Sequence, residues 1–276
     1  MVDKALGKGS ASTTGPHRNI ESSSPEGPVK SKAFSRLSST PVPKILIAGL
    51  TFIIGILVSG LILLHEDQEG FLVWIREDGF VEWLTFVELL IMCVFSFMMS
   101  KAFSHSNRES AAERVWFVLG FLFLFGAMEE ISWGQRVFGI ESPEWFLMHN
   151  KQGEINLHNL VIYGVKINKL VFGKILAILV GFYLLIVPLA YRVHGRFRNF
   201  LDRWAVPVPQ NYQILLFVIV TVVVQLHLKL ETKAGELMEL CNCFLFLLIL
   251  MHPYNHEVFP PEGVRFWKLE GKGYQR

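Results

Sequence analysis

The chain has 276 residues, of which 51% are hydrophobic, and its mean hydropathy is +0.39. Its formal net charge of +2 is too small to indicate nucleic-acid binding, and the basic residues lie in short segments between apolar blocks. The apolar residues form long uncharged blocks rather than amphipathic periods. We therefore predict an all-α protein, a polytopic bundle of transmembrane helices surrounded by membrane lipid, and no nucleic-acid partner.

Residues 1–43 are rich in Ser, Pro and Gly and predict a disordered tail. This segment is too long and too polar to be the start of an ordinary cleavable signal peptide, so the first apolar block is expected to remain as an anchor. The uncharged blocks that follow predict six spans, at about residues 45–64, 81–99, 115–135, 170–191, 214–230 and 237–251. Residues 252–276 form a polar C-terminal tail.

Basic residues separate the two sides of the predicted bundle. Lys and Arg are frequent in the N-terminal tail, in segments 100–114 and 192–212 and in the C-terminal tail, and sparser in segments 65–79 and 136–169. The positive-inside rule then predicts that both termini are cytoplasmic. The three cysteines all lie in apolar blocks, so we expect buried thiols rather than a disulfide framework: Cys93, Cys241 and Cys243.

Two adjacent carboxylates, Glu129 and Glu130, follow the uncharged residues 115–128. We extend the third span past them to about residue 135, because the uncharged part alone would reach only about 21 Å at 1.5 Å per residue. The predicted topology brings Glu88 and His227 to the same level. A charge at membrane depth costs about 2.5–3.5 kcal/mol on insertion scales, so these groups are expected to face one another in an outward-opening polar cavity.

The segment after the third span supplies a predicted lid for this cavity. Glu154 and His158 are four residues apart and would share one face of a short helix over residues 153–164. Such a helix would lie at the membrane surface or fold into the cavity mouth.

Three functional interpretations of these groups are open. In an enzyme, Glu129 or Glu130 would be the base or nucleophile and His158 its partner, with Glu88 and His227 in support. In a metal site, Glu130, Glu154 and His158 would bind a divalent ion such as zinc or iron. In a transporter, Glu88, Glu129 and His227 would relay protons or ions.

A structural interpretation is open as well. Glu129 and Glu130 would then only mark the end of a short third helix, with Arg136 paired to Glu129 along one face.

The motif Glu-Glu-Ile-Ser-Trp-Gly-Gln-Arg at residues 129–136 is followed by Phe-Gly-Ile-Glu-Ser-Pro-Glu at 138–144 and Asn-Lys-Gln-Gly-Glu-Ile-Asn-Leu-His-Asn at 150–159. Together these segments resemble a family of uncharacterised polytopic membrane proteins from bacteria. The resemblance carries no activity, but it implies that the motifs belong to one site and that the setting is a bacterial inner membrane.

Our leading hypothesis is a membrane-embedded enzyme that acts on a lipid or lipid-linked substrate from the extracytoplasmic side. A proton- or ion-coupled transporter and a non-catalytic subunit of a membrane complex are the alternatives.

Overall fold

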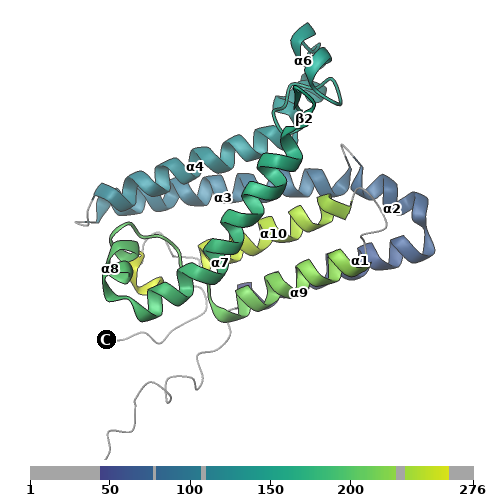
Figure 1. The fold of residues 1–276 in the computed structure, drawn as a ribbon. Helices are drawn as coiled ribbons and strands as arrows, with labels where there is room; N and C mark the ends of the chain where they lie inside the picture. Colours follow the sequence, from purple (N-terminus) through teal and green to yellow (C-terminus); the bar gives the residue numbers. More distant parts are fainter. Residues whose placement is uncertain (1–43, 77–78, 107–109, 228–233, 261–276) are drawn as a thin grey trace, which may run out of the picture. The chain divides into compact units, whose positions relative to one another are not determined.

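The computed structural model describes residues 44–76, 79–106, 110–227 and 234–260 (Figure 1). The predicted disordered tail, and the C-terminal tail beyond residue 260, lie outside this described part. Helices make up most of the described chain, and one short hairpin interrupts them. The prediction of a helical protein is therefore confirmed.

The principal helices are α1 (Lys44–Glu66), α2 (Gln68–Ile75), α3 (Phe80–His105), α4 (Ser110–Glu130), α7 (Leu176–Val193), α9 (Asn211–His227) and α10 (Ala234–Met251). Four stretches are long and apolar enough to cross a membrane; they correspond to α1, to α3 together with α2, to α4 and to α7. This supports the prediction of a membrane protein. Helix α9 is apolar but shorter.

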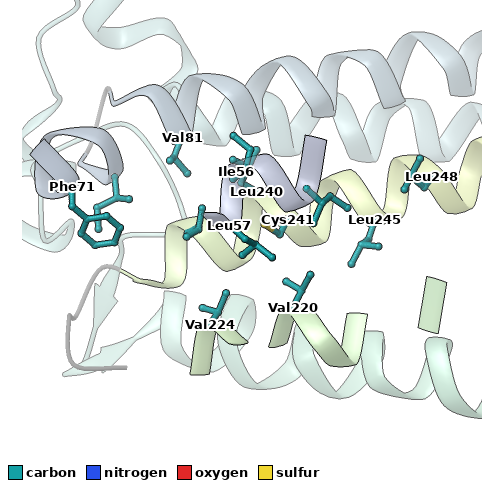
Figure 2. Packing of buried hydrophobic residues seen from close by; sticks show 13 residues of the cluster. Ile56, Leu57, Phe71, Val81, Val220, Val224, Leu240, Cys241, Leu245 and Leu248 are labelled. Atoms are coloured by element: carbon teal, nitrogen blue, oxygen red, sulfur yellow. The ribbon is translucent and has the colours of Figure 1, made fainter. Parts of the chain in front are cut away.

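Helices α3 and α4 lie side by side, and α10 packs against α3, α9 and α1 (Figure 1). One buried apolar cluster joins α1, α2, α9 and α10 through side chains such as Leu57, Phe71, Val220 and Leu245 (Figure 2). A second cluster joins α3, α4 and α10. These two clusters hold α3 and α10 to their neighbouring helices, which positions the polar residues that these helices carry.

The three cysteines carry free thiols within these helices. Cys93 and Cys241 are buried, as predicted, and Cys243 is half-buried. Cys241 belongs to the cluster that Figure 2 shows.

Helix α4 ends at Glu130, before the predicted end of the third span at about residue 135. It reaches membrane length because it begins at Ser110, before the predicted start. Ser132, Trp133 and Gly134 have φ values of 47°, 57° and 75°, in the left-handed region that cannot continue a right-handed helix. Glu129 and Glu130 therefore form the last turn of α4.

The predicted helix over residues 153–164 is not confirmed. After the short helices α5 (Gln135–Phe138) and α6 (Glu144–His149), residues 150–160 form what we call the polar loop, closed by a bridge between Asn150 and Leu160. A hairpin follows, in which β1 (Val161–Ile162) pairs with antiparallel β2 (Val165–Lys166).

Local sequence explains why turns replace the predicted helix. Gly153 has φ +71°, and Tyr163 and Gly164 have φ 50° and 77°, the two positive values that a type I′ hairpin turn needs. The Asn150 side chain donates to the backbone oxygen of Asn156 at 2.9 Å. Asparagine side chains that bind nearby backbone groups in this way compete with helix formation.

The chain then continues through the π-helical segment η3 (Asn168–Ile175) into α7, and through α8 (Gly195–Arg203) to α9. A third small apolar cluster of Val187, Tyr191, Leu201 and Val208 packs α8 against the end of α7. The Trp116 indole donates to the carbonyl of Ala205 at 3.0 Å, which ties the first half of α4 to the turn that follows α8.

Candidate functional site

The Glu129 carboxylate lies where α4 meets the polar loop, and its residue is only 3% exposed. Its Oε1 accepts a hydrogen bond from the Trp133 indole at 2.8 Å. Its Oε2 accepts the backbone N–H groups of Leu157 at 2.7 Å and His158 at 3.1 Å. Hydrogen bonds to a carboxylate are stronger than those between neutral groups. Glu129 therefore anchors the polar loop to the end of α4.

The imidazole of His158 lies beside the same carboxylate. Its Nδ1 is 3.6 Å from Glu129 Oε2, an ion-pair distance, and its Nε2 is 2.9 Å from Asn159 Nδ2. Burial lowers the pKa of His158, but the contact with Glu129 and the charges of Glu239 and Glu236 outweigh burial and raise the pKa above its ordinary value. The imidazole is thus a proton-accepting group held among carboxylates.

A second carboxylate, Glu154, anchors the polar loop from the opposite direction. It is ion-paired with Arg136, and its Oε2 accepts hydrogen bonds from Ser132 Oγ at 2.6 Å and Asn156 Nδ2 at 3.0 Å. Ser132 Oγ in turn accepts from Asn156 Nδ2 at 2.9 Å. These bonds hold Ser132 in its left-handed conformation, which is costly for a residue with a Cβ atom.

Gln135 makes a third connection between the two motifs. Its Nε2 donates to Ser142 Oγ at 2.6 Å, and its Oε1 accepts the backbone N–H of Ile155 at 2.7 Å. Ser142 also donates to the carbonyl of Gly153. Residues 129–136 and the polar loop are therefore bonded together through side chains on both sides.

Glu130 points in a different direction from its neighbour Glu129, although the two charges still interact, since adjacent helical residues point in directions about 100° apart. It is half-buried, and its charge interacts with those of Glu82 on α3 and of Glu236 and Glu239 at the start of α10. Glu236 and Glu239 are exposed. We call these four residues the acidic cluster; three helices contribute to it.

The two supporting residues predicted from the sequence lie apart from these contacts. Glu88 is buried inside α3 at 3% exposure, and neither of its carboxyl oxygens has a hydrogen-bond partner in the part of the chain that the structure describes. His227 is the last residue of α9, and its side chain falls outside the described part.

The residues predicted to bind a metal have separate partners. Glu154 is bonded to Arg136 and Ser132, whereas His158 faces Glu129. Across residues 44–260, leaving aside the gaps in the description, no three or more His, Cys, Asp or Glu side chains are placed to hold a metal ion. The metal interpretation stays a prediction without support from this geometry.

Sequence reasoning missed the residues that connect the two motifs. None of Ser132, Trp133, Gln135 and Asn156 was expected to connect the two motifs. Arg136 was considered a partner of Glu129, whereas it pairs with Glu154. The available signal was the density of hydrogen-bonding side chains in both motifs. A polar loop next to an apolar helix must satisfy its backbone groups, and side chains of the adjacent motif are the nearest source.

In comparisons with known proteins, no family model, no curated protein and no solved structure matches this chain. The function is therefore inferred from the geometry of the site.

Proposed function

We propose that this protein is a membrane-embedded enzyme that acts on a lipid or lipid-linked substrate, with His158 as the acid–base group and Glu129 as the residue that orients it. The observation that carries the proposal is the 3.6 Å contact between His158 Nδ1 and Glu129 Oε2 at the end of a helix of membrane-spanning length. A histidine held by a carboxylate through one ring nitrogen is the arrangement used in general acid–base catalysis.

The chemistry follows from the two nitrogens of the imidazole. With a proton on Nδ1 facing Glu129, Nε2 carries a lone pair that accepts a hydrogen bond from Asn159 Nδ2. A substrate hydroxyl or a water that replaces this contact would give its proton to Nε2, and Glu129 would stabilise the resulting imidazolium. Catalytic hydrogen bonds are often long before the substrate binds, so the 3.6 Å distance is compatible with this role.

The acidic cluster supplies binding groups beside the imidazole. The charges of Glu236 and Glu239 act on both His158 and Glu130, so both groups lie within electrostatic range of the same two carboxylates. Carboxylates accept hydrogen bonds from hydroxyl and amine groups, which are common in lipid head groups. This assigns Glu130 to substrate binding and Glu129 to positioning, in place of the base or nucleophile role considered from the sequence.

The apolar surroundings of the site favour a lipid as the substrate. Val137 and Phe138 of α5 and Leu147 and Met148 of α6 are exposed, with Phe138 at 75% and Met148 at 72%. Large apolar side chains next to membrane-length helices are typical of segments that lie in the membrane interface. A substrate anchored in the bilayer would reach the polar loop along this surface.

We further propose six spans, with α9 and α10 as the fifth and sixth, both termini in the cytoplasm, and the site facing the extracytoplasmic side of a bacterial plasma membrane. The distribution of Lys and Arg along the sequence supports this orientation.

A proton- or ion-coupled transporter is the second candidate. The buried carboxyl of Glu88, which has no hydrogen-bond partner among the described residues, favours it. A non-catalytic subunit of a membrane complex is the third, favoured by the structural use of the Glu129 and Glu154 carboxylates.

The test is lipid turnover by the purified protein in vesicles made from a bacterial total lipid extract, followed by mass spectrometry. Wild type is expected to convert one lipid class, and His158→Gln to lose about 10²- to 10⁴-fold of the rate, the usual contribution of a general acid–base group. His149→Gln is the matched control, because His149 lies on α6 and stacks on Trp145. Absence of turnover in wild type, or full activity in His158→Gln, contradicts the proposal.

A further inference from the structure

Glu88 lies within α3, which packs against α10, and it has no role in the site described above. The residue is 3% exposed, and both of its carboxyl oxygens are completely buried. Within the described ranges, neither oxygen accepts a hydrogen bond or joins an ion pair. A buried carboxyl without partners requires a physical explanation, because buried polar groups are nearly always bonded.

Among the described residues, the surroundings of Glu88 offer acceptors and thiols rather than cations. On α10, Cys241 and Cys243 lie close enough to interact electrostatically with Glu88. The charges of Glu130 on α4 and Glu239 on α10 also act on the Cys243 thiol. Asn242, between the two cysteines, has a buried Oδ1 that also lacks a donor in the described part of the chain.

An ionised carboxylate in this environment would be strongly unfavourable, since no donor in the described part of the chain compensates for its lost hydration. A protonated carboxyl is neutral and carries a hydroxyl that needs one acceptor. Hydroxyl groups on the same helix already find such acceptors: Thr85 Oγ1 donates to the carbonyl of Val81 at 3.1 Å, and Ser96 Oγ to that of Met92 at 2.7 Å. A bound proton would therefore let Glu88 remain inside the bundle.

We propose that Glu88 is a proton-binding site, separate from the Glu129–His158 pair, and that its bound proton keeps α3 packed against α10. Loss of the proton leaves a carboxylate that must be hydrated, and water can reach it only if the two helices separate locally. The site thereby links proton release to the packing of the bundle.

A hydrophobic carbodiimide tests proton binding directly. The protonated carboxyl adds to a carbon–nitrogen double bond of the reagent, and the resulting O-acylisourea rearranges to a stable N-acylurea, so the adduct forms only where a proton is present. Peptide mapping of the full chain in lipid vesicles is expected to find the adduct on Glu88. The labelling rate should fall about tenfold per pH unit once the carboxyl ionises.

Two variants identify the labelled group. Glu88→Gln should abolish this adduct, and Glu144→Gln, which changes an exposed carboxylate on α6, should leave it unchanged. An unlabelled Glu88 at every pH overturns the proposal.

The Cys241 thiol, which is 1% exposed, reports helix separation. In a background with Cys93→Ala and Cys243→Ala, maleimide labelling of Cys241 is compared between Glu88 and Glu88→Gln proteins at each pH. A negative charge on Glu88 disfavours the nearby thiolate, so it cannot by itself speed the labelling. The two proteins should react equally at low pH, and the protein with Glu88 several-fold faster at high pH. Equal rates throughout would show that proton release does not loosen the α3–α10 contact.

Discussion

Glu129 Oε2 holds both parts of His158: it accepts the backbone N–H of that residue at 3.1 Å and lies 3.6 Å from its imidazole Nδ1. The carboxylate therefore fixes the position of the histidine backbone and the direction of its ring at once. Because Glu129 belongs to the last turn of α4, a displacement of that helix end would move the imidazole with it.

Glu129→Gln should detach the polar loop from α4. The glutamine amide cannot accept all three N–H donors, and a buried donor left without a partner costs about 1–3 kcal/mol. We expect a lower unfolding temperature and faster hydrogen exchange at the amides of Leu157 and His158. Glu141→Gln, at an exposed position in the same region, is the control. Unchanged exchange at the two amides would show that the anchor is dispensable.

The Arg136–Glu154 ion pair should contribute a measurable coupling energy. The Glu154 side chain is 11% exposed and that of Arg136 31%, so the pair is less screened than a surface ion pair. In a double-mutant cycle with Arg136→Met and Glu154→Gln, we expect a coupling within the range of about 0.5–3 kcal/mol found for bonded neighbours. Additive effects of the two changes on the free energy of unfolding would contradict this.

His158 should make stability fall as the pH rises above neutral. Its pKa is raised in the folded protein despite burial, because of Glu129 and the charges of Glu239 and Glu236, so the folded state holds a proton that the unfolded chain releases near pH 6.5. The stabilisation is complete below that pH and is lost as the pH passes through the raised pKa. The free energy of unfolding should fall in wild type as the pH rises from about 6.5 through the raised pKa, and this fall should be absent in His158→Gln. The same fall in both proteins would contradict the assignment.

His252 should make the protein less stable as the pH falls, the opposite of the effect of His158. Burial, together with the charge of His256, lowers the pKa of His252 to about 4. Its Nδ1 is 2.6 Å from Gln210 Nε2 and 3.0 Å from the Tyr212 hydroxyl. Stability from the neutral ring is present above about pH 6.5 and is lost as the pH falls toward the folded pKa. Between these pH values the free energy of unfolding should fall less in His252→Gln than in wild type. An equal fall in the two proteins would exclude this role.

The long helices could be predicted from the sequence because uncharged length alone identifies them, as the agreement for α1, α3 and α7 illustrates. The end of α4 could not, since the turn there depends on left-handed backbone at Ser132 and Trp133, residues without a strong preference for it. Likewise, the four-residue spacing of Glu154 and His158 is compatible with one face of a helix. Only the hydrogen bonds that the surrounding side chains make to this segment favour turns instead.

The candidate site was predicted in part. The sequence identified four polar residues next to an apolar helix: Glu129, Glu130, Glu154 and His158. Their partners depend on where each side chain points, and the spacing of residues along the sequence does not determine that. Glu129 meets His158, whereas Glu154 is drawn to Arg136. Glu130, one residue from Glu129, joins the acidic cluster instead.

The most direct measurement of the central claim is the pH dependence of lipid turnover in wild type and in Glu129→Gln. If neutral His158 is the base, the rate of wild type rises with pH through the raised pKa of the imidazole, and in Glu129→Gln this rise moves to lower pH while the maximal rate falls. A rise at the same pH in both proteins, or one that persists in His158→Gln, would contradict the claim that Glu129 and His158 act together.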